Sequence, residues 1–134
     1  MSSLVLEGVA PGGRADGGVL WCAVGYTPCS YAVPVWVAAK ERIPSMLNGD
    51  APANRLAVRL SHSVRPIDWD DKYVDVKSLR RIIRRVESAE RTELKAGRRL
   101  VGEMDRRGFD PAAVDRFNAE ADARFERFKN QFDR

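Results

Sequence analysis

Residues 76–104 read VKSLRRIIRRVESAERTELKAGRRLVGEM, and the spacing of the apolar residues in this stretch decides how the chain folds. These residues recur at intervals of three and four: Leu79, Ile82, Ile83, Val86, Ala89, Leu94, Gly97, Leu100, Val101 and Met104. This period is typical of an amphipathic helix that buries one face. Asp75 is suited to cap the first turn, and RRGFDP at 106–111 ends the pattern. The stretch therefore predicts one helix of about 30 residues.

A second helix is predicted directly after this stop. Asp110 is placed to cap it, and Pro111 occupies the first helical position, where its missing N–H costs no hydrogen bond. The apolar stripe of this helix is Val114, Phe117, Ala121, Phe125, Phe128 and Phe132. Because the connector is short, we expect the two helices to fold back as an antiparallel hairpin.

Upstream of residue 75 the pattern favours strands and loops. SSLVLEGV (2–9) and VLWCAVGY (19–26) flank a Gly-rich loop and predict an antiparallel hairpin, its second strand buried on both faces. Residues 31–39 look extended, with Pro34 restricting them to an edge strand or an irregular segment. The segment 41–54 predicts a loop with a helical turn around residues 45–47, 54–64 favours a short helix over a strand, and 65–76 is irregular. The predicted fold class is α+β, antiparallel strands followed by a helical hairpin.

Composition and charge also divide the chain near residue 75. Residues 1–75 carry 7 Lys and Arg against 8 Asp and Glu, and residues 76–134 carry 16 against 11, which together give the net charge of +4. At 134 residues we expect a single domain or the C-terminal fragment of a larger one, with a β/loop part (1–75) and a helical part (76–134). No apolar run is long enough to span a membrane, and the start lacks the pattern of a signal peptide. If Met1 is the natural start, the protein is expected in the cytoplasm; if the chain is a fragment, the missing part can carry an export signal.

The most conspicuous charge cluster is RRIIRR, which places Arg80, Arg81, Arg84 and Arg85 on the long helix. Acidic residues follow at once and offer partners such as Glu87 for Arg91. No aromatic residues alternate with the arginines to stack on bases. The sequence therefore predicts a solvated, ion-paired helix face. The alternative is a stand-alone interaction module whose helix 77–91 binds an acidic partner or nucleic acid, and of these two, nucleic acid is not expected.

Other motifs give no catalytic, metal or cofactor site. His62 is the only histidine and has only serines beside it, DWDD at 68–71 lacks the Gly and closing Glu of a calcium loop, and GGRADGG is better explained as a hairpin turn than as a phosphate loop. Ser2 would become an N-terminal nucleophile if Met1 were removed, although any chain can begin Met-Ser. Two cysteines are too few for a disulfide framework or a zinc site. We expect Cys22 to be buried in a strand and Cys29 to be exposed in a turn, with pairing of the two left open.

The order of these features resembles a known family. SSLVLEGV, VLWCAVGYTPCSYAVPVWVAA, IPSML, NGDAPANRLAVRL and RPIDWDDKYVDVKSL are similar to the C-terminal part of N-terminal nucleophile hydrolases of the linear amide C–N hydrolase group, which includes penicillin acylases and acyl-CoA:6-aminopenicillanic-acid acyltransferase-like proteins. The resemblance covers about residues 2–80, with the helical tail fitting more loosely. It implies a four-layer αββα sandwich and attack on a non-peptide amide by an N-terminal Cys.

The resemblance also implies what this chain lacks. The family's nucleophile lies upstream of the matched segment, so the chain alone is expected to be inactive, with Tyr26, Cys29 and Ser30 as substrate-binding residues in the wall of a pocket. Ser2 falls where the family has an internal strand residue, which argues against it as nucleophile. The expected partner is the missing N-terminal part or a second copy of the chain, with association through the strands of 19–37. A purely structural relative of the hydrolases is the remaining hypothesis.

Overall fold

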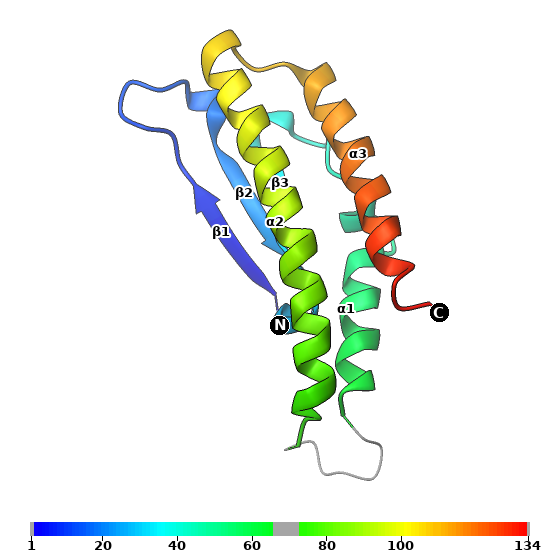
Figure 1. Ribbon diagram of the computed structural model, residues 1–134. Coiled ribbons are helices and arrows are strands. Elements are labelled where there is room, and N and C mark those ends of the chain that lie inside the picture. The colour runs from blue at the N-terminus through cyan, green and yellow to red at the C-terminus, as the bar shows by residue number, and fades with distance from the viewer. Residues whose placement is uncertain (1, 66–72, 134) are drawn as a thin grey trace.

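The computed structural model describes residues 2–65 and 73–133, which form a small sheet packed against three helices (Figure 1). The strands are β1 (Ser3–Glu7), β2 (Val19–Ala23) and β3 (Val33–Trp36), and the helices are α1 (Pro52–Ser63), α2 (Val76–Arg107) and α3 (Pro111–Lys129). Short 3₁₀ turns lie between the strands and before α1, including Thr27–Cys29 and Ser45–Leu47. The predicted α+β class is confirmed.

The helix α2 is the spine of the molecule. It crosses in front of β2 and β3, and α1 and α3 lie along its other side, one beside each half (Figure 1). The predicted caps are confirmed, because the Asp75 carboxylate accepts hydrogen bonds from the backbone N–H groups of Lys77 and Ser78, and Asp110 accepts one from Ala112. Gly108, at φ 89°, ends α2 in a conformation that favours glycine. Both predicted helices therefore begin where the sequence places them, and α2 also ends there; α3 ends at Lys129, before the last residue of the predicted stripe, Phe132, and runs back alongside α2.

The sheet has the strand order β1-β2-β3, and both pairs are antiparallel. The hairpin of β1 and β2 is confirmed, as is the edge position of Pro34, whose missing N–H is tolerated on the outer strand β3. The chain leaves β3 through a 3₁₀ turn at Val37–Ala39, so the predicted extended segment is shorter than 31–39. The helical turn at 45–47 and the helix over 54–64 are also confirmed, and the first part of the chain thus contains α1 as well as loops and strands. Of the segment predicted to be irregular, residues 66–72 lie outside the described residues.

The two faces of the sheet have different environments. Val19, Trp21, Pro34 and Trp36 share the face beneath α2, where Gly97 permits contact so close that a Cβ there would lie 2.8 Å from the Trp21 ring. The paired residues Leu6, Leu20 and Val35 point to the opposite face, together with Leu4, Cys22 and Val33. Leu4 and Leu6 are 62% and 68% exposed, and Leu20 and Val35 are half-buried. The prediction that 19–26 is buried on both faces is therefore wrong for Leu20. Cys22 and Val33 on this same face are buried, at 8% and 1% exposed, so the face is uncovered only in part.

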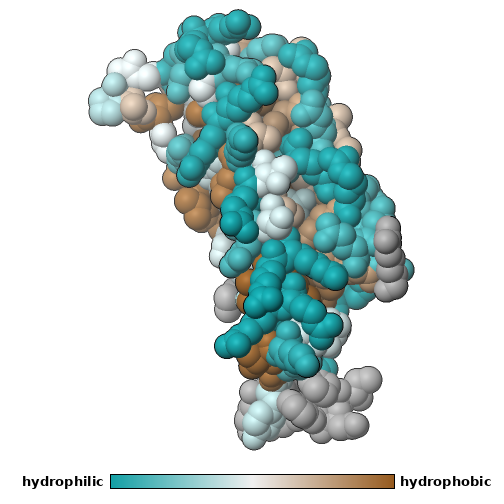
Figure 2. Space-filling model, in the orientation of Figure 1, coloured by the Kyte–Doolittle hydropathy of each residue, from teal (hydrophilic) through white to brown (hydrophobic). Residues whose placement is uncertain are grey.

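The core lies between the covered face of the sheet and the three helices. It joins Trp21 and Trp36 to the apolar stripes of α1, α2 and α3, and the Trp36 ring meets the Phe117 ring edge-on with centroids 5.0 Å apart. The stripe predicted for α3 is buried from Val114 to Phe128, with Phe132 half-buried. In Figure 2 the helical surface is mainly hydrophilic, whereas hydrophobic residues gather along the left margin, where Figure 1 places the strands. No helix of the described residues has the length and hydrophobicity needed to cross a bilayer.

Candidate functional site: a basic groove between two helices

The predicted substrate-binding residues lie in the turn that follows β2. Gly25 has φ 87° and approaches α1 so closely that a Cβ would meet Asn54 and Ala57 at under 3 Å. The turn Thr27–Cys29 then packs against α1 and α2. The half-buried Tyr26 ring lies beneath the Arg65 guanidinium, which is 5.4 Å from its centroid, while Ser30 is buried. Tyr26, Cys29 and Ser30 are thus close along one turn that is packed into the body of the protein.

Cys29 is not exposed, which corrects the expectation from its place in a turn. It is 1% exposed and lines, with Ser30, an internal void of about 10 Å³ that is too small for a substrate. Burial raises the pKa of its thiol to about 11, so the reactive thiolate is disfavoured at neutral pH. Burial also raises the pKa of Cys22, and both cysteines are free thiols. In the described chain, Cys29 and Ser30 pack the interior rather than line an open pocket.

The four clustered arginines of α2 are all exposed, but they do not form one patch. Arg84 and Arg85 line a groove between α2 and α3, whereas Arg81 and Arg85 line a hollow beside Arg59 of α1. Arg80 lines neither. The ion pair expected between Glu87 and Arg91 is not formed, because the Arg91 guanidinium donates to the Glu87 backbone carbonyl at 3.3 Å.

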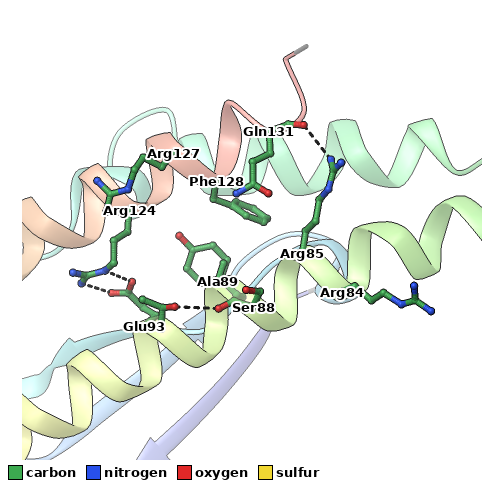
Figure 3. Close-up of a pocket in the computed structure, with 11 residues that line it drawn as sticks. Arg84, Arg85, Ser88, Ala89, Glu93, Arg124, Arg127, Phe128 and Gln131 are labelled. Atoms are coloured by element: carbon green, nitrogen blue, oxygen red, sulfur yellow. Dashed lines mark hydrogen bonds and ion pairs between the residues drawn. The ribbon is translucent and has the colours of Figure 1, made fainter.

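The groove between α2 and α3 has a volume of about 370 Å³ and is open to solvent. Figure 3 shows its two walls: Arg84, Arg85, Ser88 and Ala89 come from α2, and Arg124, Arg127, Phe128 and Gln131 come from α3 and the turn after it. Four arginines and one glutamate, Glu93, line the groove. The lining therefore has an excess of positive charge beside the apolar surface of Phe128 and Ala89.

A buried ion pair closes one end of this groove. Glu93 is 1% exposed, and both its carboxylate oxygens accept hydrogen bonds from Arg124, at 2.8 Å from Nε and 3.0 Å from Nη2 (Figure 3). These bonds raise the pKa of Arg124 and fix its guanidinium plane. Arg124 also lies 3.5 Å from Glu120. Glu93 is thus neutralised by a bidentate ion pair with Arg124. The positive charges of the other three arginines in the groove are not neutralised by Glu93.

Tyr31 supplies an unused hydroxyl to the groove. The residue is 6% exposed, lines the groove, and meets the Phe128 ring edge-on with centroids 5.2 Å apart. Its hydroxyl makes no hydrogen bond with the part of the chain that the structure describes, and it is open to solvent in the groove. Burial, and next the negative charge of Glu93, raise the pKa of Tyr31 well above its usual value. The phenol therefore stays protonated and can donate to a bound acceptor.

Arg84, Arg85 and Arg127 retain free donors as well. Neither Arg84 nor Arg127 forms a hydrogen bond or ion pair within residues 2–65 and 73–133. Arg85 donates one bond of 3.0 Å to the Gln131 carbonyl, and its guanidinium lies 5.1 Å from the Phe132 ring centroid. A guanidinium has five N–H donors, so this bond leaves most of them unused.

The remaining candidate residues from the sequence, His62 and Ser2, do not lie in a cluster of catalytic or metal-binding side chains in the described chain. His62 is exposed in the last turn of α1, and Ser2 accepts a hydrogen bond of 3.2 Å from the Gly25 backbone N–H. Within the described ranges, no three His, Cys, Asp or Glu side chains gather closely enough to hold a metal ion. The aspartates of 68–71 lie outside the described residues.

Sequence reasoning missed four residues of the groove: Tyr31 before β3, Glu93 on α2, and Arg124 and Arg127 on α3. Glu93 could have been found, because it occupies a position of the apolar stripe between Ala89 and Gly97 where a charge requires a partner. Arg124 and Arg127 are ordinary residues of a charged helix, and Tyr31 is one aromatic among several, so nothing in the sequence distinguishes them. Comparisons of the chain with protein-family models, curated proteins and solved structures found no match.

Proposed function

We propose that this chain is the C-terminal portion of an N-terminal nucleophile hydrolase or acyltransferase that acts on linear, non-peptide amides. In this proposal it supplies one helical layer and part of one sheet of an αββα sandwich, and the nucleophile belongs to a preceding polypeptide. The observation that carries the proposal is the incompletely covered sheet, with helices on one face and, on the other, an exposed apolar patch centred on Leu4 and Leu6 of β1.

The layer order supports this assignment. In an αββα sandwich each sheet packs helices on its outer face and the second sheet on its inner face. The face beneath α2 corresponds to the outer one, and Leu4, Leu6, Leu20 and Val35 form an apolar surface where the second sheet would pack. Exposed leucines at this density are unfavourable in water and gain free energy when another layer covers them.

The strand β1 supports it as well. It pairs with β2 on one side only, so its outer edge presents unpaired backbone N–H and C=O groups. All five of its residues are exposed, and on the face beneath α2 the Trp21 Nε1–H donates a hydrogen bond of 2.8 Å to the Glu7 carboxylate. A strand exposed on both faces and at its edge is well suited to continue into a larger sheet.

The chemistry of the described residues agrees with a scaffold role. Cys29 is sealed with a raised pKa, and the groove arginines and Tyr31 offer hydrogen-bond donors without an activated nucleophile. The proposal therefore places the attacking group, its base and the oxyanion donors outside this chain, and leaves the turn at 26–30 to support a pocket from behind.

The test is to isolate the protein from its native source under native conditions and to identify the polypeptide joined to it or bound to it. We expect a preceding segment whose mature N-terminus is Cys, read by N-terminal sequencing, and hydrolysis of a chromogenic linear amide such as phenylacetyl-p-nitroanilide. The recombinant 134-residue chain is the matched control and should have no activity. Isolation of the chain as a lone 15.0 kDa monomer, or with a partner that lacks an N-terminal nucleophile, would overturn the proposal.

A further inference from the structure

We propose that the groove between α2 and α3 binds a small organic anion, a carboxylate or phosphate carried on an apolar body, with the arginines along its walls (Arg84, Arg85 and Arg127) supplying positive charge and Tyr31 donating a hydrogen bond. The groove lies on the helical side of the sheet, so this inference stands apart from the hydrolase proposal and goes beyond it.

The size and lining of the groove define the class of ligand. A volume of about 370 Å³ is at the lower end of the range for small-molecule sites. Phe128 and Ala89 provide an apolar surface, and polar groups stand at both walls. This combination suits a compact ligand with one charged end and one ring or chain, rather than a fully polar ion.

The sign of the charge follows from the arginines. The lining carries four arginines against one glutamate, and Arg124 is held by both oxygens of that glutamate. Arg84 and Arg127 have no partner in the described chain, and Arg85 uses one donor on Gln131. Guanidinium groups bind carboxylate and phosphate through paired N–H donors, so the free groups match an anion.

Tyr31 adds a neutral hydrogen-bond donor to the arginines of the groove. The residue is 6% exposed as a whole, and its hydroxyl, which has no hydrogen bond in the described chain, is open to solvent in the groove, where it can donate to a bound acceptor. Its position at the groove, edge-on to Phe128, lets the hydroxyl reach an acceptor seated beside the ring. A ligand seated there would accept a hydrogen bond from this hydroxyl and lie in the positive potential of the arginines along the groove.

The experiment is an NMR titration of the full chain with phenyl phosphate, benzoate, inorganic phosphate and the neutral analogue benzyl alcohol. The readouts are the arginine Nε–H and Phe128 ring resonances. We expect saturable shifts with phenyl phosphate or benzoate, weaker binding of inorganic phosphate, and none of benzyl alcohol. Comparison of the two aromatic anions identifies which head group the site prefers.

Two variants and one control localise the binding. The double variant R84Q/R127Q should weaken binding by about tenfold or more, since each arginine supplies charge-assisted hydrogen bonds. Tyr31→Phe keeps the ring contact with Phe128 and should weaken binding about fivefold through loss of the hydroxyl. The control R98Q/R107Q removes the same charge from exposed positions of α2 outside the groove and should leave affinity unchanged.

Several outcomes would overturn the inference. They are the absence of saturable shifts with every anion at millimolar concentration, equal weakening by R98Q/R107Q and R84Q/R127Q, and full affinity in Tyr31→Phe. A single-stranded oligonucleotide that binds through Arg80 and Arg81, with the aromatic anions inert, would also overturn it and would favour the nucleic-acid alternative. None of these results bears on whether the sheet face packs against a preceding polypeptide.

Discussion

The ion pair between Glu93 and Arg124 is the one in the described chain whose carboxylate is fully buried. Its contribution to the free energy of unfolding therefore depends on that burial. Glu93 is 1% exposed, so its charge has lost nearly all its water and depends on Arg124 for compensation. The exposed pair Arg99–Glu103 has the same chemistry on the surface of α2. Comparison of the two separates the effect of burial from that of charge pairing.

We expect Glu93→Gln to lower the free energy of unfolding by about 2–3 kcal/mol, because Arg124 then keeps a partly buried charge without its counter-charge. The matched change Glu103→Gln should cost less than about 0.5 kcal/mol, as exposed pairs do. Urea unfolding followed by circular dichroism measures both. Equal effects of the two substitutions would show that burial of Glu93 has no energetic consequence.

The raised pKa of the Cys29 thiol should make the stability of the protein depend on pH in alkaline solution. Its pKa rises from 9.0 to about 11 on folding, because burial disfavours the thiolate. Between these values the unfolded chain has released a proton that the folded chain retains, so rising pH favours unfolding. We expect the free energy of unfolding to fall by about 2 kcal/mol between pH 9 and pH 11 through this group.

Chemical denaturation at several pH values checks this expectation, with Cys29→Ala as the reference. The variant should be less stable at neutral pH and should show a shallower decline above pH 9. Parallel profiles for the two proteins would contradict the assignment to Cys29.

At the scale of elements, Gly97 decides how close α2 lies to the sheet. A Cβ at this position would lie 2.8 Å from the Trp21 ring and 3.0 Å from Pro34, whereas Gly102 on the same helix has only the end of Arg106 nearby, at 3.7 Å. Alanine is favoured over glycine in a helix by about 1 kcal/mol wherever space allows. The two glycines therefore differ in packing and not in helix propensity.

We expect Gly97→Ala to destabilise the protein by about 1–3 kcal/mol, because a displaced Trp21 ring outweighs the gain in helix propensity. Gly102→Ala should instead stabilise it by about 0.5–1 kcal/mol. Thermal or urea unfolding distinguishes the signs. A stabilising Gly97→Ala would mean that α2 is free to move away from the sheet.

Much of this element structure was predictable, since it depends on local patterns. The caps Asp75 and Asp110 and the apolar stripes set the bounds of α2 and α3, and the Gly-rich loop set the hairpin of β1 and β2. What could not be predicted depends on contacts distant in sequence. The burial of Cys29 results from the packing of its turn against α1 and α2, and the groove forms only where Tyr31, α2 and α3 meet. The proposed function rests on the exposed part of the sheet face. The resemblance led us to expect such a face, because a fragment of a sandwich lacks its second sheet.

At the scale of the whole molecule, the uncovered face of the sheet governs solution behaviour. Leu4 and Leu6 are more than 60% exposed beside the open edge of β1. The association expected through residues 19–37 stays a prediction. Most of β2 and β3 is already buried, so β1 is the strand with the most surface available for self-association. Apolar faces and open edges together promote self-association.

We expect the isolated chain to associate in a concentration-dependent manner in sedimentation velocity experiments, and Leu4→Gln/Leu6→Gln to be monomeric under the same conditions. Val58→Gln/Val76→Gln is the matched control, since both valines are exposed on helices away from the sheet. This control should associate like the parent chain. A parent chain that remains monomeric at high concentration would contradict the expectation.

The dependence of the sheet on α2 has a further consequence during synthesis. Ala32, beside β3, donates its backbone N–H to Glu90 of α2, 58 positions later in the chain. A ribosome adds about 5–20 residues per second, so the hairpin of β1 and β2 waits roughly 3–12 seconds before its covering helix exists. During that interval both faces of a strongly apolar strand are open to solvent. The nascent chain is therefore most vulnerable to misassembly before α2 is made, and a chaperone that binds extended apolar segments would find its best target between Val19 and Trp36.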